Sequence, residues 1–337
     1  MVLRALLLLS LVIASLAPAA AQERVTIGTQ RLAESGALFL AVARGYFRAE
    51  GLDVEMTAYK SDKEVAQAVA AGAVDFGLSA FSPEAFNYAA QGFFKFIAAS
   101  VKERPGFEGN EVVAANAAWA NGLRKIENLA GKSVAITYLG SQYHYQLAQI
   151  ARVKKFEFAS MTIKPMQTVD AAAIAVAEGK AEAAILPASY ARELMVASQA
   201  KLVGWYSETG DEQQLGALFV SSKVLAAQRP TVQKVLRAYR RGAADYAAMV
   251  QLDRYGKRIS TVKTREIATV IARYAFPGRQ LGRAAATIDN SAFSMDPQAR
   301  LDMADLERQV AWFKAQKLIN EDVDARAIVD TSFDSSP

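Results

Sequence analysis

The sequence predicts an α/β protein of two lobes, each a mostly parallel sheet flanked by helices, with two crossover strands between them. Helical and strand-like segments alternate along the chain, which is typical of parallel strands joined by helices. The order of segments from Val25 to Gly72 recurs from Val134 to Gly179 over nearly the same length. A short extended segment follows each unit. Because the recurrence happens only twice, it indicates a duplicated lobe and not a solenoid.

The first unit contains the clearer local signals. Gly72 ends an alanine-rich helix, and Pro83 suits a first helical position, where its missing N–H needs no partner. The expected elements are strands over 24–29, 52–59, 74–79 and 96–100, and helices over 37–43, over 63–71 and from Pro83.

The second unit repeats this order of elements, although its local sequence signals are weaker. Gly140 and Ser141 open its first helix, and Gly179 ends its second. The expected elements are a turn over 128–132, strands over 133–138, 161–166 and 181–186, and helices over 141–153, 168–179 and 187–197. The extended segments 110–115 and 214–221 are the predicted crossovers, and together they would form a hinge. A long helix over 231–250 and further helices ending near Leu318 follow.

The N-terminus predicts a signal peptide over residues 1–21. Arg4 is the only charged residue before Glu23, and the apolar run 5–17 is followed by small residues. We expect cleavage after Ala21, with an uncleaved anchor as the alternative, although the run is short for a bilayer span. The chain has no cysteine, so it has no disulfide and no lipid anchor of the bacterial lipoprotein kind.

Composition restricts the possible chemistry. The formal net charge is +5 and the basic residues are scattered, so a nucleic-acid partner is not expected. One histidine and no cysteine exclude a two-histidine or thiolate zinc site, and the spacing indicates no carboxylate-only site. No nucleophile elbow, phosphate loop or dinucleotide fingerprint is present. We therefore expect no catalytic residues, no metal and no cofactor.

Two passages carry a resemblance to a known family. They are GYFRAEGLDVE at 45–55 and AAGAVDFGL at 70–78, and the closing segment 323–333 fits the same pattern. The sequence resembles the nitrate/sulfonate/taurine-type (NitT/TauT, NMT1-like) solute-binding proteins of bacterial ABC importers. The resemblance implies the type II periplasmic binding protein fold, with the C-terminal helices in the first lobe. We therefore expect lobe I to comprise 22–112 and 216–337, and lobe II to comprise 113–215.

The resemblance also implies a function. The protein would be a periplasmic monomer without stable membrane insertion that captures a small organic anion or a polar ring-containing solute. It would deliver this solute to an ABC permease in the inner membrane. The alternatives are an enzyme on the same fold, similar to the thiamine-pyrimidine synthases, and a periplasmic ligand sensor. The missing cysteines disfavour the synthase branch, which relies on a cysteine-rich motif.

Ligands of such sheets bind beyond the carboxyl ends of the strands, so the residues that leave each strand are the candidates. The helix start after the first strand suits an anion, and Arg31 could clamp it unless it is a plain loop residue. Phe81 could instead be a core residue, and Tyr59 could cap the core. The lobe I candidates are Gln30, Arg31, Ser35, Gly36, Tyr59, Lys60, Ser79, Ala80, Phe81 and Ser82.

The lobe II candidates centre on YLGSQYHY at 138–145. Gly140 allows close approach of the chain to a ligand, Ser141 can cap the helix or donate, and the following rings suit a planar solute. Some of these rings must face inward, and Tyr190 could be an ordinary helix residue. The candidates are Gly140, Ser141, Gln142, Tyr143, His144, Pro187 and Tyr190.

Overall fold

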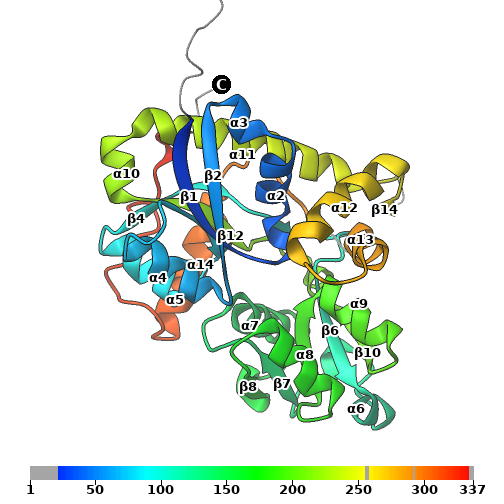
Figure 1. Cartoon of the computed structure of the whole chain (residues 1–337). Coiled ribbons are helices and arrows are strands. Elements are labelled where there is room, and N and C mark those ends of the chain that lie inside the picture. Colours follow the sequence, from blue (N-terminus) through cyan, green and yellow to red (C-terminus); the bar gives the residue numbers. More distant parts are fainter. Residues whose placement is uncertain (1–21, 255–257, 291–292, 334–337) are drawn as a thin grey trace, which may run out of the picture.

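The computed structural model describes residues 22–254, 258–290 and 293–333. The predicted signal peptide, residues 1–21, lies outside the described residues. The chain forms two lobes, each built around its own sheet (Figure 1). Among the described residues, no helix combines the length and the apolar character that crossing a bilayer requires.

The sheet of lobe I has, within the described residues, five strands in the order β2-β1-β3-β12-β4. Strands β1, β2 and β3 are mutually parallel in their pairings, whereas β12 runs antiparallel between β3 and β4. The strands are β1 (Glu23–Gln30), β2 (Leu52–Tyr59), β3 (Phe76–Ala80), β4 (Phe94–Ala99) and β12 (Gly216–Ser221).

The sheet of lobe II repeats this plan in the order β10-β6-β9-β7-β8 over the described residues. Strands β7, β8 and β9 are parallel, and β6 runs antiparallel to both β9 and β10. The strands are β6 (Asn110–Ala115), β7 (Ser133–Ile136), β8 (Thr162–Pro165), β9 (Ala183–Pro187) and β10 (Ala200–Trp205).

Two crossover segments connect the lobes. They pair as a short antiparallel ladder of β5 (Lys102–Glu103) with β11 (Gln213–Gln214). Strand β5 leads toward β6 in lobe II, and β11 leads back to β12 in lobe I. The two connections therefore lie side by side, which is the arrangement of a hinge.

Helices cover both sheets (Figure 1). Those that follow or cover the lobe I sheet are α2 (Gly36–Ala43), α3 (Tyr46–Ala49), α4 (Asp62–Ala70), α5 (Pro83–Ala90), α10 (Ser222–Ala227), α11 (Arg229–Met249), α12 (Val262–Ala275), α13 (Leu281–Asp289) and α14 (Met303–Ala315). Those of lobe II are α6 (Asn116–Ala120), α7 (Gln142–Lys154), α8 (Val169–Ala177) and α9 (Ala188–Val196). Short 3-10 turns are η2 (Ala33–Ser35), η3 (Ile126–Leu129), η4 (Phe158–Ser160), η5 (Tyr206–Thr209) and η6 (Thr331–Phe333), and β13 (Gln251–Leu252) pairs with β14 (Arg258–Ile259).

Side-chain caps fix the helix starts that face the space between the lobes. Ser61, Ser82, Ser141 and Thr168 each accept a hydrogen bond from the amide three residues later, at the starts of α4, α5, α7 and α8. Pro83 occupies the first turn of α5, as the sequence predicts. These caps set where each strand-to-helix loop ends.

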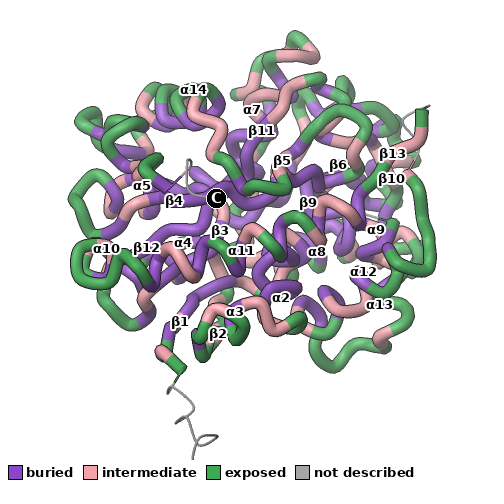
Figure 2. The backbone as a smooth tube through the Cα atoms, turned by 90° about the horizontal axis from the view of Figure 1, so that it is seen from above, coloured by how far each residue is buried: buried purple, intermediate pink, exposed green. Residues whose placement is uncertain are grey.

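The core runs through the central strands of both sheets, and β3, β4, β6, β9 and β12 are buried along nearly their whole length (Figure 2). The edge strands β2 and β8 are mostly half-buried or exposed. A satellite cluster in lobe I combines aromatic rings from β4, β12, α5 and α14 with aliphatic side chains, including those of α4. Helix α11 packs closely on α2, where a Cβ at Gly242 would lie 2.1 Å from the Ala37 carbonyl oxygen. That close approach requires glycine at 242.

The predicted fold class is confirmed, and most element boundaries agree within one to three residues of the expectation. Strand β7 ends at Ile136 and not at 138, so Thr137 and Tyr138 lie in a loop. The predicted crossover 214–221 is divided into β11 and β12. The closing segment lies beside β4, where Val329 bridges Phe96. The exact lobe boundaries stay a prediction.

Candidate binding site between the lobes

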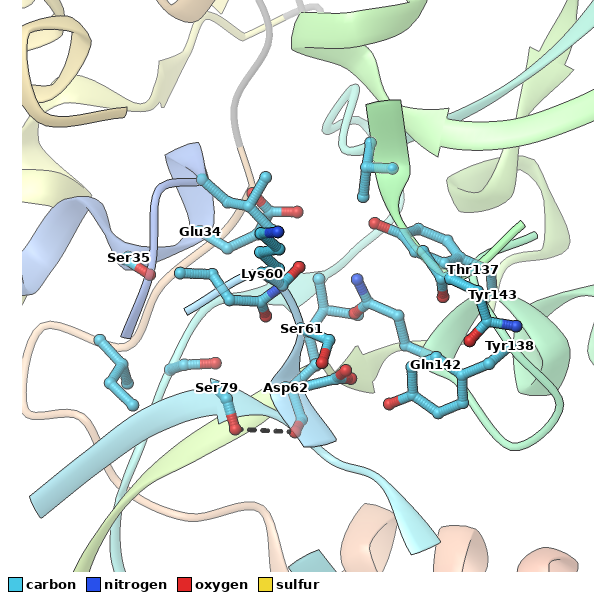
Figure 3. A pocket seen from close by; sticks show the side chains of 18 residues that line it. Glu34, Ser35, Lys60, Ser61, Asp62, Ser79, Thr137, Tyr138, Gln142 and Tyr143 are labelled. Carbon is cyan, nitrogen blue, oxygen red and sulfur yellow. Dashed lines mark hydrogen bonds between the residues drawn. The ribbon is translucent and has the colours of Figure 1, made fainter. Parts of the chain in front are cut away.

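A partly open cavity lies where the loops of the two lobes meet, with about 560 Å³ of empty space when the open solvent at its mouth is included. Figure 3 shows Glu34, Asp62 and Lys60 on one side and Tyr138, Gln142 and Tyr143 facing them from the other. The complete lining is Gln30, Leu32, Glu34, Ser35, Lys60, Ser61, Asp62, Leu78, Ser79, Ala80, Ser100, Thr137, Tyr138, Gln142, Tyr143, Gln167, Val169 and Leu215. We call this space the inner cavity.

The lobe I wall comes from the carboxyl ends of three parallel strands. Glu34 follows β1 in the turn η2, Lys60 to Asp62 follow β2, and Ser79 and Ala80 end β3. Because parallel strands end at the same sheet edge, these residues meet although they are far apart in the chain. The Gln30 side chain donates to the Lys60 carbonyl at 3.4 Å and ties two of these loops together.

The lobe II wall is built in the same way from the ends of β7 and β8 and the first turn of α7. Gln167 has φ 73°, a left-handed conformation that is unfavourable for a residue with a side chain. Its amide donates to the Thr137 carbonyl at 2.6 Å, which holds the loop in this conformation. The two loops therefore form a rigid wall opposite lobe I.

Glu34 has the most unusual environment in the cavity. The residue as a whole is partly exposed, but both carboxylate oxygens are inaccessible to water and have no hydrogen-bond partner. Burial raises the pKa of this carboxyl to about 7, and its own backbone amide offsets the shift only in part.

Asp62 is the second buried carboxyl of the inner cavity and the first residue of α4. Burial raises its pKa to about 6, the nearby Tyr138 hydroxyl lowers it, and Glu84 raises it further. The amide of Lys63 donates to its Oδ1 at 3.1 Å. Asp62 and Tyr138 belong to different lobes, so they face each other across the cavity.

Three more polar atoms of lobe II are buried without a hydrogen-bond partner: the hydroxyls of Tyr138 and Tyr143 and Oε1 of Gln142. Burial holds the pKa of both phenols well above its usual range, so both are neutral hydroxyls that can donate or accept. Unsatisfied buried polar atoms are rare in folded proteins, and a polar solute in the cavity would supply partners for these three.

An outer cavity lies beside the inner one and shares Gln30, Leu32, Lys60 and Val169 with it. Arg279 lies there with its guanidinium carbon 5.4 Å from the Tyr190 ring centre and 4.5 Å from that of Phe276. Arg279 also pairs with Glu193. The remaining lining is Arg31, Ala58, Tyr59, Thr168, Asp170, Ala275 and Pro277.

The structure brings many of the predicted residues together. Those that line the inner cavity are Gln30, Ser35, Lys60, Ser79, Ala80, Gln142 and Tyr143. Those that line the outer cavity are Gln30, Arg31, Tyr59, Lys60 and Tyr190. The other predicted residues, which line neither cavity, are Gly36, Phe81, Ser82, Gly140, Ser141, His144 and Pro187.

Packing explains the lobe I exceptions. The Phe81 ring is 1% exposed and stacks on Phe86 at 5.3 Å, inside the satellite core. The Ser82 hydroxyl caps α5. Gly36 lies against Tyr246, whose ring would be 2.7 Å from a Cβ at that position. The plain core interpretation of Phe81 is therefore the one that the structure favours.

The lobe II exceptions have structural roles as well. Ser141 caps α7, and the ring of His144 packs against Trp312 at 5.4 Å while its Nδ1 accepts from the Gly140 amide at 3.0 Å. Burial lowers the His144 pKa to about 4, so the ring is neutral. Gly140 approaches Pro83 of lobe I, and Pro187 ends β9. These residues position the wall without lining it.

Several lining residues were missed by sequence reasoning, above all Glu34, Asp62 and Tyr138. Glu34 adjoins the predicted Ser35, and Asp62 and Tyr138 lie two residues from the predicted Lys60 and Gly140, so a wider window around each strand end would have included all three. The burial of the Glu34 carboxyl gave no sequence signal, because an acidic residue in a loop is usually solvated.

The site offers binding groups more than catalytic ones. Within the described residues, no group of three or more His, Asp or Glu side chains is placed to hold a metal ion. The inner cavity combines two carboxyls, two phenols, hydroxyls and amides, which suits hydrogen bonding to a small polar solute.

Comparisons with known proteins agree with this architecture. The model of a family described as NMT1/THI5 like matches residues 33–250. A search of curated proteins by sequence finds no match. The structure is similar to the ligand-binding component of an ABC-type import system from Staphylococcus aureus, with a TM-score of 0.71 and 10% identity over 94% of this chain and 99% of that one.

Two further solved structures share the fold. The periplasmic aliphatic sulphonate binding protein SsuA from Escherichia coli has a TM-score of 0.70 and 16% identity, over 92% of each chain. The desulfurization enzyme DSZB has a TM-score of 0.60 and 14% identity, over 92% of this chain and 97% of that one. At these identities the likeness establishes the fold, and the fold hosts both binding proteins and an enzyme.

Proposed function

The chain belongs to the NMT1/THI5-like family, and we propose on that basis that it is the solute-binding component of an ABC import system. The observation that carries the proposal is the inner cavity, which is walled by both lobes and lined by buried polar atoms without partners. A small solute would satisfy these atoms and join the two walls.

The proposed mechanism is closure about the crossover ladder. The solute binds to one lobe while the lobes are apart, and the hinge then brings the second wall into contact. Closure is favoured because the solute contacts both lobes only in the closed arrangement. No bond in the solute needs to change.

Location and partners follow from the same proposal. After removal of residues 1–21 the protein acts in the periplasm as a monomer, and the solute-loaded form docks on a permease in the inner membrane. The family membership and the similarity to binding components of import systems support this proposal.

An enzyme on the same fold is the second candidate. The observation in its favour is the pair of carboxyls with pKa raised to about 7 and about 6, a property that active sites share. The lining offers no cysteine or histidine that either carboxyl could activate. Binding without conversion is therefore the function that the geometry supports best.

Equilibrium binding with recovery of the solute tests the proposal. A thermal-shift screen of sulfonates, aromatic carboxylates, pyrimidines and amines identifies binders, because a ligand of the folded state raises its melting temperature. Mass spectrometry then examines each binder after prolonged incubation. Unchanged solute in one-to-one complex is expected, and a chemically altered solute would favour the enzyme.

A further inference from the structure

We propose that the inner cavity binds a solute through a cationic nitrogen group, a protonated amine or amidinium, whose N–H groups donate to Glu34. This inference rests on the proposed function and names the ligand class. It differs from the small organic anion expected from the sequence, and it is compatible with the other expectation, a polar ring-containing solute, where that solute carries a cationic nitrogen.

The first support is the missing partner of Glu34. Two other buried carboxyls differ from it: Glu103 accepts from the Asn110 amide at 2.6 Å, and Glu111, whose oxygens also accept no hydrogen bond, forms an ion pair with the Arg192 Nε at 3.3 Å. The Glu34 oxygens have neither a hydrogen bond nor an ion pair among the described residues. A buried carboxylate without a partner is costly, and a donor from the solute would remove that cost.

The second support is the charge at the helix starts. An anion would bind to the free amides at the starts of α2 and α4. Glu34 lies two residues before α2 begins, and Asp62 is the first residue of α4, whose cap position is filled by Ser61. A carboxyl therefore lies close to each of these helix starts, and when ionised it would repel a sulfonate or carboxylate.

The third support is the distribution of basic side chains around the two cavities. Among the residues that line the inner cavity, Lys60 is the one basic side chain, and it is exposed and extends to the outer cavity. Arg31 and Arg279 line the outer cavity alone. The positive charge thus lies toward the mouth, and the enclosed end is acidic.

The pH dependence of the binding affinity distinguishes a cationic solute from an anionic one, because the two affinities change in opposite directions with pH. A cation binds the ionised carboxylate, so its affinity rises with pH through about 7, where Glu34 ionises. An anion binds the protonated carboxyl and loses affinity over the same range. The titratable groups that face or influence Glu34 are Lys60, Asp62, Glu103, Tyr138, Tyr143, Tyr190 and Tyr246.

Calorimetric titration with size-matched probes tests this class. The probes are methylamine, guanidine, benzylamine and benzamidine against acetate, benzoate and benzenesulfonate, each at pH 6 and pH 8. We expect at least one cation to bind, with affinity several-fold higher at pH 8. Glu34→Gln should weaken it at least tenfold and remove the pH dependence, and Glu55→Gln, at an exposed β2 position, should change neither.

A ligand-free measurement keeps the test independent of the probe. Since the ionised Glu34 is unpaired, Glu34→Gln should melt a few degrees higher than the wild type at pH 8. A lower melting temperature, binding of the anions alone, no cation binding, or full cation affinity in Glu34→Gln would overturn the proposal. If only anions bind and they are recovered unchanged, then the cationic ligand class is wrong but the proposed transport function is not affected. If the solute is chemically converted, then the proposed transport function is wrong.

Discussion

Gly140 of lobe II lies directly against Pro83 of lobe I, where a Cβ at position 140 would be 2.5 Å from the proline Cγ. Residue 140 also has φ 91°, a conformation that favours glycine. Glycine thus allows the loop before α7 in lobe II to contact the start of α5 in lobe I. The sequence predicts that Gly140 approaches a ligand, and the structure places the opposite lobe there.

Gly140→Ala should therefore weaken solute binding by about tenfold, because the added methyl group keeps the lobes apart, at a cost of about 1–2 kcal/mol. Gly131→Ala is the matched control, since Gly131 has φ 76° but open space around its Cβ. Both variants should lose similar stability from backbone strain. Equal affinity of the two variants in calorimetric titration would contradict an inter-lobe role for Gly140.

Gln146 joins the two sides of the hinge. Its Oε1 accepts from the Asn110 side chain at 3.0 Å, and its Nε2 donates to Gln213 at 2.9 Å. Gln146→Met should lower the free energy of unfolding by about 2 kcal/mol, because it leaves two buried polar side chains unpaired. Urea unfolding measures the change.

Gln149→Met on the same helix is the control for Gln146, because Gln149 bonds to the exposed Arg152. It should change stability by less than about 0.5 kcal/mol. A similar loss of stability in both variants would mean that the buried hydrogen bonds of Gln146 to Asn110 and Gln213 add nothing to stability.

His144 should make the protein less stable below neutral pH. Its pKa falls from the ordinary 6.5 to about 4 in the folded protein, so the unfolded chain binds a proton first and stability is lost as the pH falls below 6.5. The effect is at most about 3 kcal/mol. The raised pKa values of Glu34 and Asp62 act in the opposite direction.

The comparison of wild type with His144→Gln isolates the histidine, because it is the only one in the chain. Unfolding free energies at pH 7.5 and pH 5 should differ more for the wild type than for the variant, after subtraction of shared contributions. Identical pH dependence in the two proteins would show that the buried ring does not titrate as described.

Phe81→Ala should lower stability by about 3–5 kcal/mol, because the ring lies in the satellite core against Phe86 and Phe96. Phe81→Leu, which fills more of the space, should lose less. Thermal and urea unfolding measure both. If Phe81→Ala unfolds like the wild type and yet binds no solute, then the ring acts at the site and the core assignment is wrong.

The sequence predicts the fold well because its signals are local. Glycines end helices, serines and Pro83 begin them, and alternation marks the strand β2, whose bounds agree with the prediction. The bounds of β6 agree with those of the predicted extended segment 110–115. The duplicated order of elements then restricts the chain to few possible sheet topologies. The insertion of β12 between β3 and β4 depends on pairing across more than a hundred residues, which no local pattern encodes.

The candidate site is harder to predict, because whether a residue lines the cavity depends on the direction in which its side chain points. The rule that ligands bind at strand ends finds the correct loops, yet adjacent residues point differently: Tyr143 lines the cavity, whereas His144 contacts Trp312. Glu34 becomes unusual only through burial by distant elements of both lobes. Such burial is a tertiary property, and composition around residue 34 does not reveal it.

The proposed function requires the two lobes to close on a small solute in the inner cavity. Small-angle X-ray scattering of the full mature chain, with and without a saturating binder from the thermal-shift screen, tests it most directly. The radius of gyration should fall on binding in the wild type and fall less in Gly140→Ala. An unchanged radius in the wild type, with the binder demonstrably bound, would show that the lobes do not close on the solute.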